Sequence, residues 1–269
     1  MAEATVVLER IEEGIDLLTL NRPERLNAMT GQLVSEMTDV LLSIAADQSS
    51  RVVILTGAGR GFCAGLDLVE GLNAPLSGEM GRVQANMWFQ KSIARLITTM
   101  REIPQPIVAA VNGPAAGGGL AMALASDVRV ASVSASFSVA FVRIGLSGCD
   151  VGVSWLLPRL IGASRASEMM LTGRKVESDE ALTAGLVSAV VPDGQVLDAA
   201  LVSARLIRAN SPFGVWMTKE VAWSNLETSS LHAAIDLENR TQILATMTGD
   251  MNEATNAWRE KRPARFENR

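Results

Sequence analysis

The chain has 269 residues, a net charge of −5, 48% hydrophobic residues and 20% charged residues, which are the proportions of an ordinary globular protein with one large core. The acidic balance and the scattered lysines and arginines argue against a nucleic-acid partner. A single histidine, His232, excludes a histidine-rich metal site, and two cysteines outside any CxxC pair predict no disulfide framework. No basic, apolar leader opens the sequence and no run of about 18 apolar residues predicts a membrane span, so we expect a cytoplasmic protein.

The first part of the sequence alternates between predicted strands and helices. Strand patterns cover residues 5–11 and 15–20, which a tight turn joins. A helix follows, because five apolar residues fall on one helical face: Leu33, Met37, Val40, Leu41 and Ile44. Residues 51–56 (RVVILT) form a short apolar run without alternation, which predicts a strand covered on both faces.

Residues 69–82 contain three glycines and a proline and predict a mobile loop beside a ligand. The elements predicted after this loop are a helix over residues 83–100, a strand over 107–111, a short apolar helix from Gly118 or Gly119 to Leu124, and strands over 128–131 and around Phe137.

The sequence from Val151 onward is predicted to be mostly helical. Ser178, followed by Asp179 and Glu180, is typical of a helix N-cap with acids in the first turn. The remaining predicted elements are a last strand over residues 187–191 and three or four helices over 196–259, with breaks near Ser211-Pro212 and Gly249. We therefore expect an α/β protein with a core of residues 1–195 and a C-terminal helical region of residues 196–269.

Two glycine-rich turns follow β-branched apolar runs and are the most informative feature of the sequence. They are GAGRGFCAGLDL at residues 57–68 and NGPAAGGGL at residues 112–120. Glycine permits close backbone approach and conformations closed to other residues, so two backbone N–H groups are predicted to converge on one oxygen. Neither turn has the GxGxxG spacing of a dinucleotide site, and no phosphate loop is present, because GK[ST] does not occur. Tight strand-to-helix turns without further function are the alternative.

These motifs, with several others in the same order, resemble the enoyl-CoA hydratase/isomerase (crotonase) family. The matching segments are NRP at 21–23, NAM at 27–29, the two glycine turns, Ser126-Asp127, LPRLIGASRASEMMLTGRKV at 157–176, AGLV at 184–187 and EKRP at 260–263. The resemblance implies a crotonase-type spiral of ββα units, with C-terminal helices that assemble into a homotrimer or a dimer of trimers. It also implies a site for an acyl-CoA thioester, in which coenzyme A is part of the substrate and no separate cofactor is needed.

Carried over onto the two turns, the oxyanion-hole donors of the family fall on the backbone N–H groups of Leu66 and Gly118. Two such fixed donors stabilise negative charge on a thioester oxygen, each by roughly 3 kcal/mol. The substrate-binding residues that the resemblance implies are Arg25, Ala28, Ala64, Leu66, Asp67, Leu68, Gly117, Gly118 and Phe141. Asp67 is expected mainly to stabilise its turn, and the 69–82 loop and the helix after it are expected to line the acyl pocket.

Hydratases of this family carry two glutamates that position water and shuttle a proton, and this sequence has neither. The matching positions hold Ala121 and Phe141, which exchange no proton. General acid–base catalysis contributes about 10²–10⁴-fold per group, so we expect hydration to be very slow. Simple isomerases of the family keep the second acid, which is also missing here.

One acid remains nearby, Asp150, in the segment GCDVG. With a one-residue insertion, it matches an aspartate that the related dienoyl-CoA isomerase uses in proton transfer and the 4-chlorobenzoyl-CoA dehalogenase uses as a nucleophile. The dehalogenase reaction also needs a histidine, and His232 lies far along the chain. Asp150 also suits a helix N-cap. Arg143 is expected to be solvated or to lie in an interface, and the alternatives are that it pairs with Asp150 or binds an acidic acyl group.

Two hypotheses about function stay open at this point. The first is an enzyme of fatty-acid metabolism, an enoyl-CoA hydratase or isomerase or a dienoyl-CoA isomerase-like enzyme, with Asp150 as its acid/base. The second is an acyl-CoA-binding protein without turnover. Cys63 has no histidine near it in the sequence, so we expect a small buried residue rather than a nucleophile.

Overall fold

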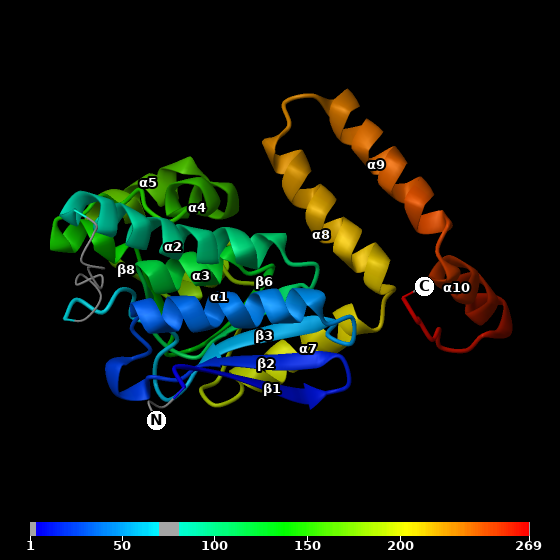
Figure 1. Ribbon diagram of the computed structural model, residues 1–269, viewed down its shortest axis with the longest axis horizontal. Coiled ribbons are helices and arrows are strands. Elements are labelled where there is room, and N and C mark those ends of the chain that lie inside the picture. The colour runs from blue at the N-terminus through cyan, green and yellow to red at the C-terminus, as the bar shows by residue number, and fades with distance from the viewer. Residues whose placement is uncertain (1–3, 70–80, 269) are drawn as a thin grey trace.

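A computed structural model describes residues 4–69 and 81–268. Its main sheet has six strands in the order β1-β2-β3-β4-β6-β9, and β1 is antiparallel to β2 while the other neighbours are parallel (Figure 1). The strands are β1 (Val6–Glu12), β2 (Ile15–Leu20), β3 (Val52–Gly57), β4 (Ile107–Val111), β6 (Val128–Ser132) and β9 (Ala189–Val191). Parallel strands end at one edge of a sheet, so the turns after β3 and β4 come together there.

Helices cover both faces of the main sheet. They are α1 (Gly31–Ala46), α2 (Arg82–Glu102) and α3 (Gly118–Ala125) on one face and α7 (Val196–Arg208) on the other. In β3, Val53 and Leu55 belong to the first apolar cluster, whereas Val52 and Ile54 belong to the second. This confirms the strand predicted to be buried on both faces. Because α7 packs on the sheet, the apolar core includes residues beyond position 195. The division of the chain at residue 195 stays a prediction.

A second, three-stranded sheet holds the second glycine turn. It consists of β5 (Ala115–Ala116), β7 (Ser136–Ser138) and β8 (Lys175–Glu177), with β7 in the middle. The strand predicted around Phe137 is confirmed as β7, whereas β5 and β8 were not predicted. They have only two and three residues, too few for a periodic pattern.

The C-terminal part of the chain is helical, with the two predicted breaks and a further, unpredicted one between Glu227 and Leu231. Its helices are α8 (Pro212–Glu227), α9 (Leu231–Thr246) and α10 (Gly249–Glu260), and α8 and α9 pack side by side, away from the sheet (Figure 1). The remaining helices lie in the sequence between β7 and β9. They are η2 (Ala140–Ile144), α4 (Val153–Ile161), α5 (Ala163–Thr172) and α6 (Ser178–Ala184). None of the helices in the described ranges is long and apolar enough to cross a membrane.

A buried ionic cluster ties α8 to the core. Lys219 Nζ donates to the carbonyl oxygens of Met100 and Gln105 at 3.1 and 2.9 Å, and lies 3.2 Å from Asp127 Oδ2. Asp127 also accepts from Arg101 at 2.6 Å and from Ile107 N at 2.8 Å. Asp127 is therefore a structural carboxylate, and it fixes the position of α8.

Two local predictions were wrong. Ser178 is the first residue of α6 rather than its N-cap, and its hydroxyl donates to the carbonyl oxygen of Val133 at 2.9 Å. A tertiary acceptor thus replaced the local capping bond. The last strand begins at Ala189 rather than at Val187. His232 lies exposed on α9.

Candidate functional site

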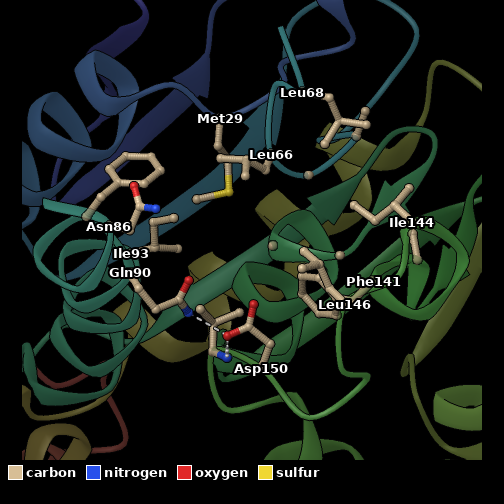
Figure 2. A pocket seen from close by; sticks show the side chains of 17 residues that line it. Met29, Leu66, Leu68, Asn86, Gln90, Ile93, Phe141, Ile144, Leu146 and Asp150 are labelled. Atoms are coloured by element: carbon tan, nitrogen blue, oxygen red, sulfur yellow. Dashed lines mark hydrogen bonds between the residues drawn. The ribbon is translucent and has the colours of Figure 1, made fainter. Parts of the chain in front are cut away.

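A cavity of about 270 Å³ lies between α2, the two glycine turns and η2 (Figure 2). Apolar side chains make up most of its wall: Met29, Leu66, Phe89, Ile93, Phe141, Ile144 and Leu146. Asn86 and Gln90 of α2 are its polar side chains, and Asp150 is the charged residue among those described that line it. The cavity thus suits a ligand with an apolar chain that lies beside the carboxylate of Asp150.

The two glycine turns dock against each other through backbone hydrogen bonds. Cys63 N donates to Pro114 O at 3.1 Å, and Ala116 N donates to Cys63 O at 3.0 Å. A Cβ on Gly119 would overlap the carbonyl oxygen of Cys63. Glycine is therefore required at position 119 for this approach, which the sequence signalled as a run of three glycines.

Leu66 N and Gly118 N are the free donors at the junction of the turns. Met29 N donates to Gly65 O at 2.7 Å and Asp67 N donates to Met29 O at 2.9 Å, so the N–H of Leu66, between them, points to the opposite side. Gly118 opens α3, where the first N–H groups have no partner within the helix. No acceptor among residues 4–69 and 81–268 takes either N–H, and both residues line the cavity.

Gly65 brings these two donors together. Its φ is +92°, a left-handed conformation that favours glycine. A Cβ placed on it would lie 2.8 Å from Ala116 O and 3.5 Å from Gly118 N. The backbone that presents Leu66 N therefore runs directly beside Gly118 N, as predicted for two turns that converge.

The two positions that the resemblance matches to the hydratase glutamates have different surroundings. Ala121 is fully buried inside α3 and belongs to the apolar core. Phe141 lines the cavity and lies against Gly117, where a Cβ would come 3.3 Å from the phenyl ring. The aromatic side chain thus takes up space at the second position and leaves no proton donor there.

Asp150 lies in the cavity wall but does not cap a helix. The N-cap of α4 is Gly152, and no side chain bonds to the free N–H groups there. Asp150 Oδ1 instead accepts from Gln90 Nε2 at 2.6 Å and from Val151 N at 2.8 Å (Figure 2). The N-cap alternative is therefore wrong, and the carboxylate is held beside the cavity.

The other predicted residues are divided between the cavity and its surroundings. Ala64, Leu68 and Gly117 line it. Outside its wall, Arg25 is exposed in the turn Pro23–Arg25, Ala28 is buried, and Asp67 pairs with Arg22 at 3.1 Å and accepts from Val69 N at 3.0 Å. Asp67 thus stabilises its turn, as predicted.

Arg143 is solvated, and no ion pair joins it to Asp150 in the described ranges. The predicted helix after the 69–82 loop does line the cavity, whereas residues 70–80 of that loop lie outside the described part of the chain.

Sequence reasoning missed Met29, Asn86 and Gln90 as individual lining residues. Met29 belongs to the NAM segment that matches the family, so this motif could have identified it as a lining residue. Asn86 and Gln90 are four residues apart and share a face of α2, but no motif marks that face as the one turned to the cavity.

The two cysteines differ in reactivity because they differ in burial. Cys63 is fully buried, and desolvation raises the pKa of its thiol to about 12, whereas Cys149 is exposed. Only the thiolate reacts with alkylating agents. At pH 8 we expect iodoacetamide to modify the native protein once, at Cys149, and a second time only after denaturation, as read by mass spectrometry. The Cys149→Ser variant is the control, and rapid alkylation of native Cys149→Ser would contradict the buried placement of Cys63.

Comparisons with known proteins agree with this geometry. The family model "Enoyl-CoA hydratase/isomerase" matches residues 10–269. A "Probable enoyl-CoA hydratase" of Mycobacterium tuberculosis is 42% identical over 262 residues, 97% of this chain and 92% of that relative. A "1,2-epoxyphenylacetyl-CoA isomerase" of Escherichia coli is 36% identical over 97% of both chains.

Among solved structures, a probable enoyl-CoA hydratase/isomerase from Mycobacterium abscessus superposes with a TM-score of 0.91. It is 40% identical and covers 98% of this chain and 99% of its own. The predicted crotonase-type fold is thereby confirmed. This chain belongs to the enoyl-CoA hydratase/isomerase family.

Proposed function

We propose that this protein binds an acyl-CoA thioester and isomerises an unsaturated acyl chain by moving one proton. The observation that carries the proposal is the pairing of two free N–H groups, on Leu66 and Gly118, with the single carboxylate of Asp150 in one cavity. The N–H pair suits a carbonyl oxygen that gains negative charge. The carboxylate can accept a proton from one carbon of the acyl chain and donate it to another.

Isomerisation fits one carboxylate better than hydration does. Hydration adds water across a double bond, so the enzyme must both position water and deliver a proton. An isomerisation removes a proton and gives it back, which one group can do alone. The relatives carry names of both kinds, hydratase and isomerase, and the single carboxylate among the described lining residues, Asp150, favours the second.

The proposed step begins with the thioester oxygen of a 3-enoyl-CoA between Leu66 N and Gly118 N. Asp150 takes a proton from carbon 2, and the electron pair moves into the carbonyl group to form a dienolate oxygen. The two N–H groups stabilise that oxygen. Asp150 then returns the proton to carbon 4, and the double bond now joins carbons 2 and 3.

A panel of 2-enoyl-, 3-enoyl- and 3,5-dienoyl-CoA thioesters tests this function, with binding followed by calorimetry and conversion by absorbance and mass. We expect conversion of a 3-enoyl- or dienoyl-CoA without a change in mass. The loss of both family glutamates favours a second candidate, a protein that binds acyl-CoA without turnover. Tight binding with no conversion of any thioester would select that candidate.

The proposed assembly is a homotrimer or a dimer of trimers formed by the C-terminal helices. Large apolar side chains lie exposed on α8, α9 and α10, as expected of a surface that a second copy covers: Leu226, Leu231, Ile243, Leu244 and Trp258.

Light scattering tests this assembly, and we expect the mass of three or six chains. Leu244→Glu should lower that mass, whereas Leu171→Glu, at an exposed position on α5, should not. The mass of one chain for the unaltered protein would contradict this assembly.

A further inference from the structure

The carboxylate of Asp150 is held by a side chain from a distant helix. Gln90 of α2, 60 residues earlier in the chain, donates from Nε2 to Asp150 Oδ1 at 2.6 Å (Figure 2). Val151 N donates to the same oxygen at 2.8 Å. No described residue donates a hydrogen bond to Oδ2. One carboxylate oxygen is therefore occupied, and the other is left for a ligand in the cavity.

The backbone beside Asp150 is unusual. Val151 is β-branched and has a φ of +37°, in the left-handed region that such residues avoid. It is 8% exposed and belongs to the large apolar cluster, so packing holds it in this conformation. Its N–H then reaches the carboxylate of the preceding residue. The loop and Gln90 together fix which way Asp150 faces.

The side-chain amide of Gln90 acts on the Asp150 carboxylate differently from a charged donor. It orients the group by a hydrogen bond to one oxygen, yet it does not neutralise the charge as a lysine or arginine would. We propose that Gln90 is the positioning residue for Asp150: it keeps Oδ1 bonded and turns Oδ2 to the substrate. This inference rests on the proposed function, in which Asp150 moves the proton.

Asn86 provides a matched control. It lies one turn before Gln90 on the same helix and lines the same cavity, but it forms no hydrogen bond to Asp150 in the described structure. A change at Asn86 alters the polarity of the cavity without touching the carboxylate. A change at Gln90 alters both.

The test compares Gln90→Glu, Gln90→Leu and Asn86→Leu in two measurements. The first is the titration of Asp150 by ¹³C NMR in protein labelled at the aspartate carboxyl carbons, with the Asp150 signal identified as the one missing from Asp150→Asn. The second is the pH profile of isomerisation. Circular dichroism and acyl-CoA binding establish that each variant is folded.

We expect Gln90→Glu to move both the titration of Asp150 and the acidic limb of the rate profile to higher pH by about one unit or more, because two carboxylates then share one site. Gln90→Leu should lower kcat with little change in KM, because Oδ2 is then no longer held toward the substrate. Asn86→Leu should leave both midpoints in place. Unchanged midpoints in folded Gln90→Glu would overturn the inference.

The two proposals fail in different ways. If Asp150→Asn keeps full activity, or the unaltered protein converts no thioester, the proposed function fails, and the NMR titration still decides whether Gln90 controls Asp150. If Asp150→Asn is inactive but the Gln90 variants match the unaltered protein in both measurements, only the role of Gln90 fails.

Discussion

Replacing Asp150 by asparagine should lower kcat/KM for isomerisation by about 100-fold or more, because general acid–base catalysis contributes about 10²–10⁴-fold. Asparagine has nearly the same shape, and its side-chain oxygen can still accept from Gln90 and Val151. The substitution thus removes the proton-transferring group while it keeps the hydrogen bonds. Binding of an acyl-CoA should change little, so the loss should fall on kcat.

Cys149→Ser is the control for Asp150→Asn. Cys149 is the neighbouring residue, it is exposed, and it does not line the cavity. Its replacement tests whether any change in this loop harms the reaction. Full activity of Asp150→Asn, measured as conversion of a 3-enoyl-CoA, would remove Asp150 from the mechanism.

Gly65→Ala should lower kcat/KM by about 100-fold, comparable to the loss of one oxyanion-hole donor. The residue has a φ of +92°, and the new Cβ would lie 2.8 Å from Ala116 O and 3.5 Å from Gly118 N. The two turns must move apart to accept it, and Leu66 N and Gly118 N then no longer converge. The effect should appear in kcat even where acyl-CoA binding persists.

Gly194→Ala separates this effect from the general cost of a left-handed alanine. Gly194 has a φ of +81°, no atom lies within 4 Å of a Cβ placed there, and the residue does not line the cavity. Both variants should lose some stability, seen in urea unfolding, but only Gly65→Ala should lose activity. Equal activities of the two variants would contradict the proposed role of the converging turns.

The parts of the site that were predictable from the sequence are those fixed by short-range rules. Gly65, Gly118 and Gly119 were predicted at the junction because only glycine permits the backbone to approach so closely. The buried strand β3 was predictable from its unbroken apolar run.

The parts that were missed depend on contacts between distant segments. Gln90 meets Asp150 across 60 residues, and nothing in the helical pattern of α2 marks the residue that will do so. Ser178 has the sequence of an N-cap but donates to Val133 instead. The alternative N-cap role of Asp150 failed for the same reason, because a tertiary partner took the place of a local one.

The most direct test of the central claim is hydrogen exchange at carbon 2 of a saturated acyl-CoA in heavy water. Such a thioester cannot isomerise, so exchange reports only carbonyl polarisation and proton transfer. With a thioester that calorimetry shows to be bound, NMR should reveal deuterium at carbon 2 for the unaltered protein and none for Asp150→Asn. Binding without exchange, or equal exchange by both proteins, would contradict the claim that the Leu66 and Gly118 N–H groups and Asp150 act on one substrate.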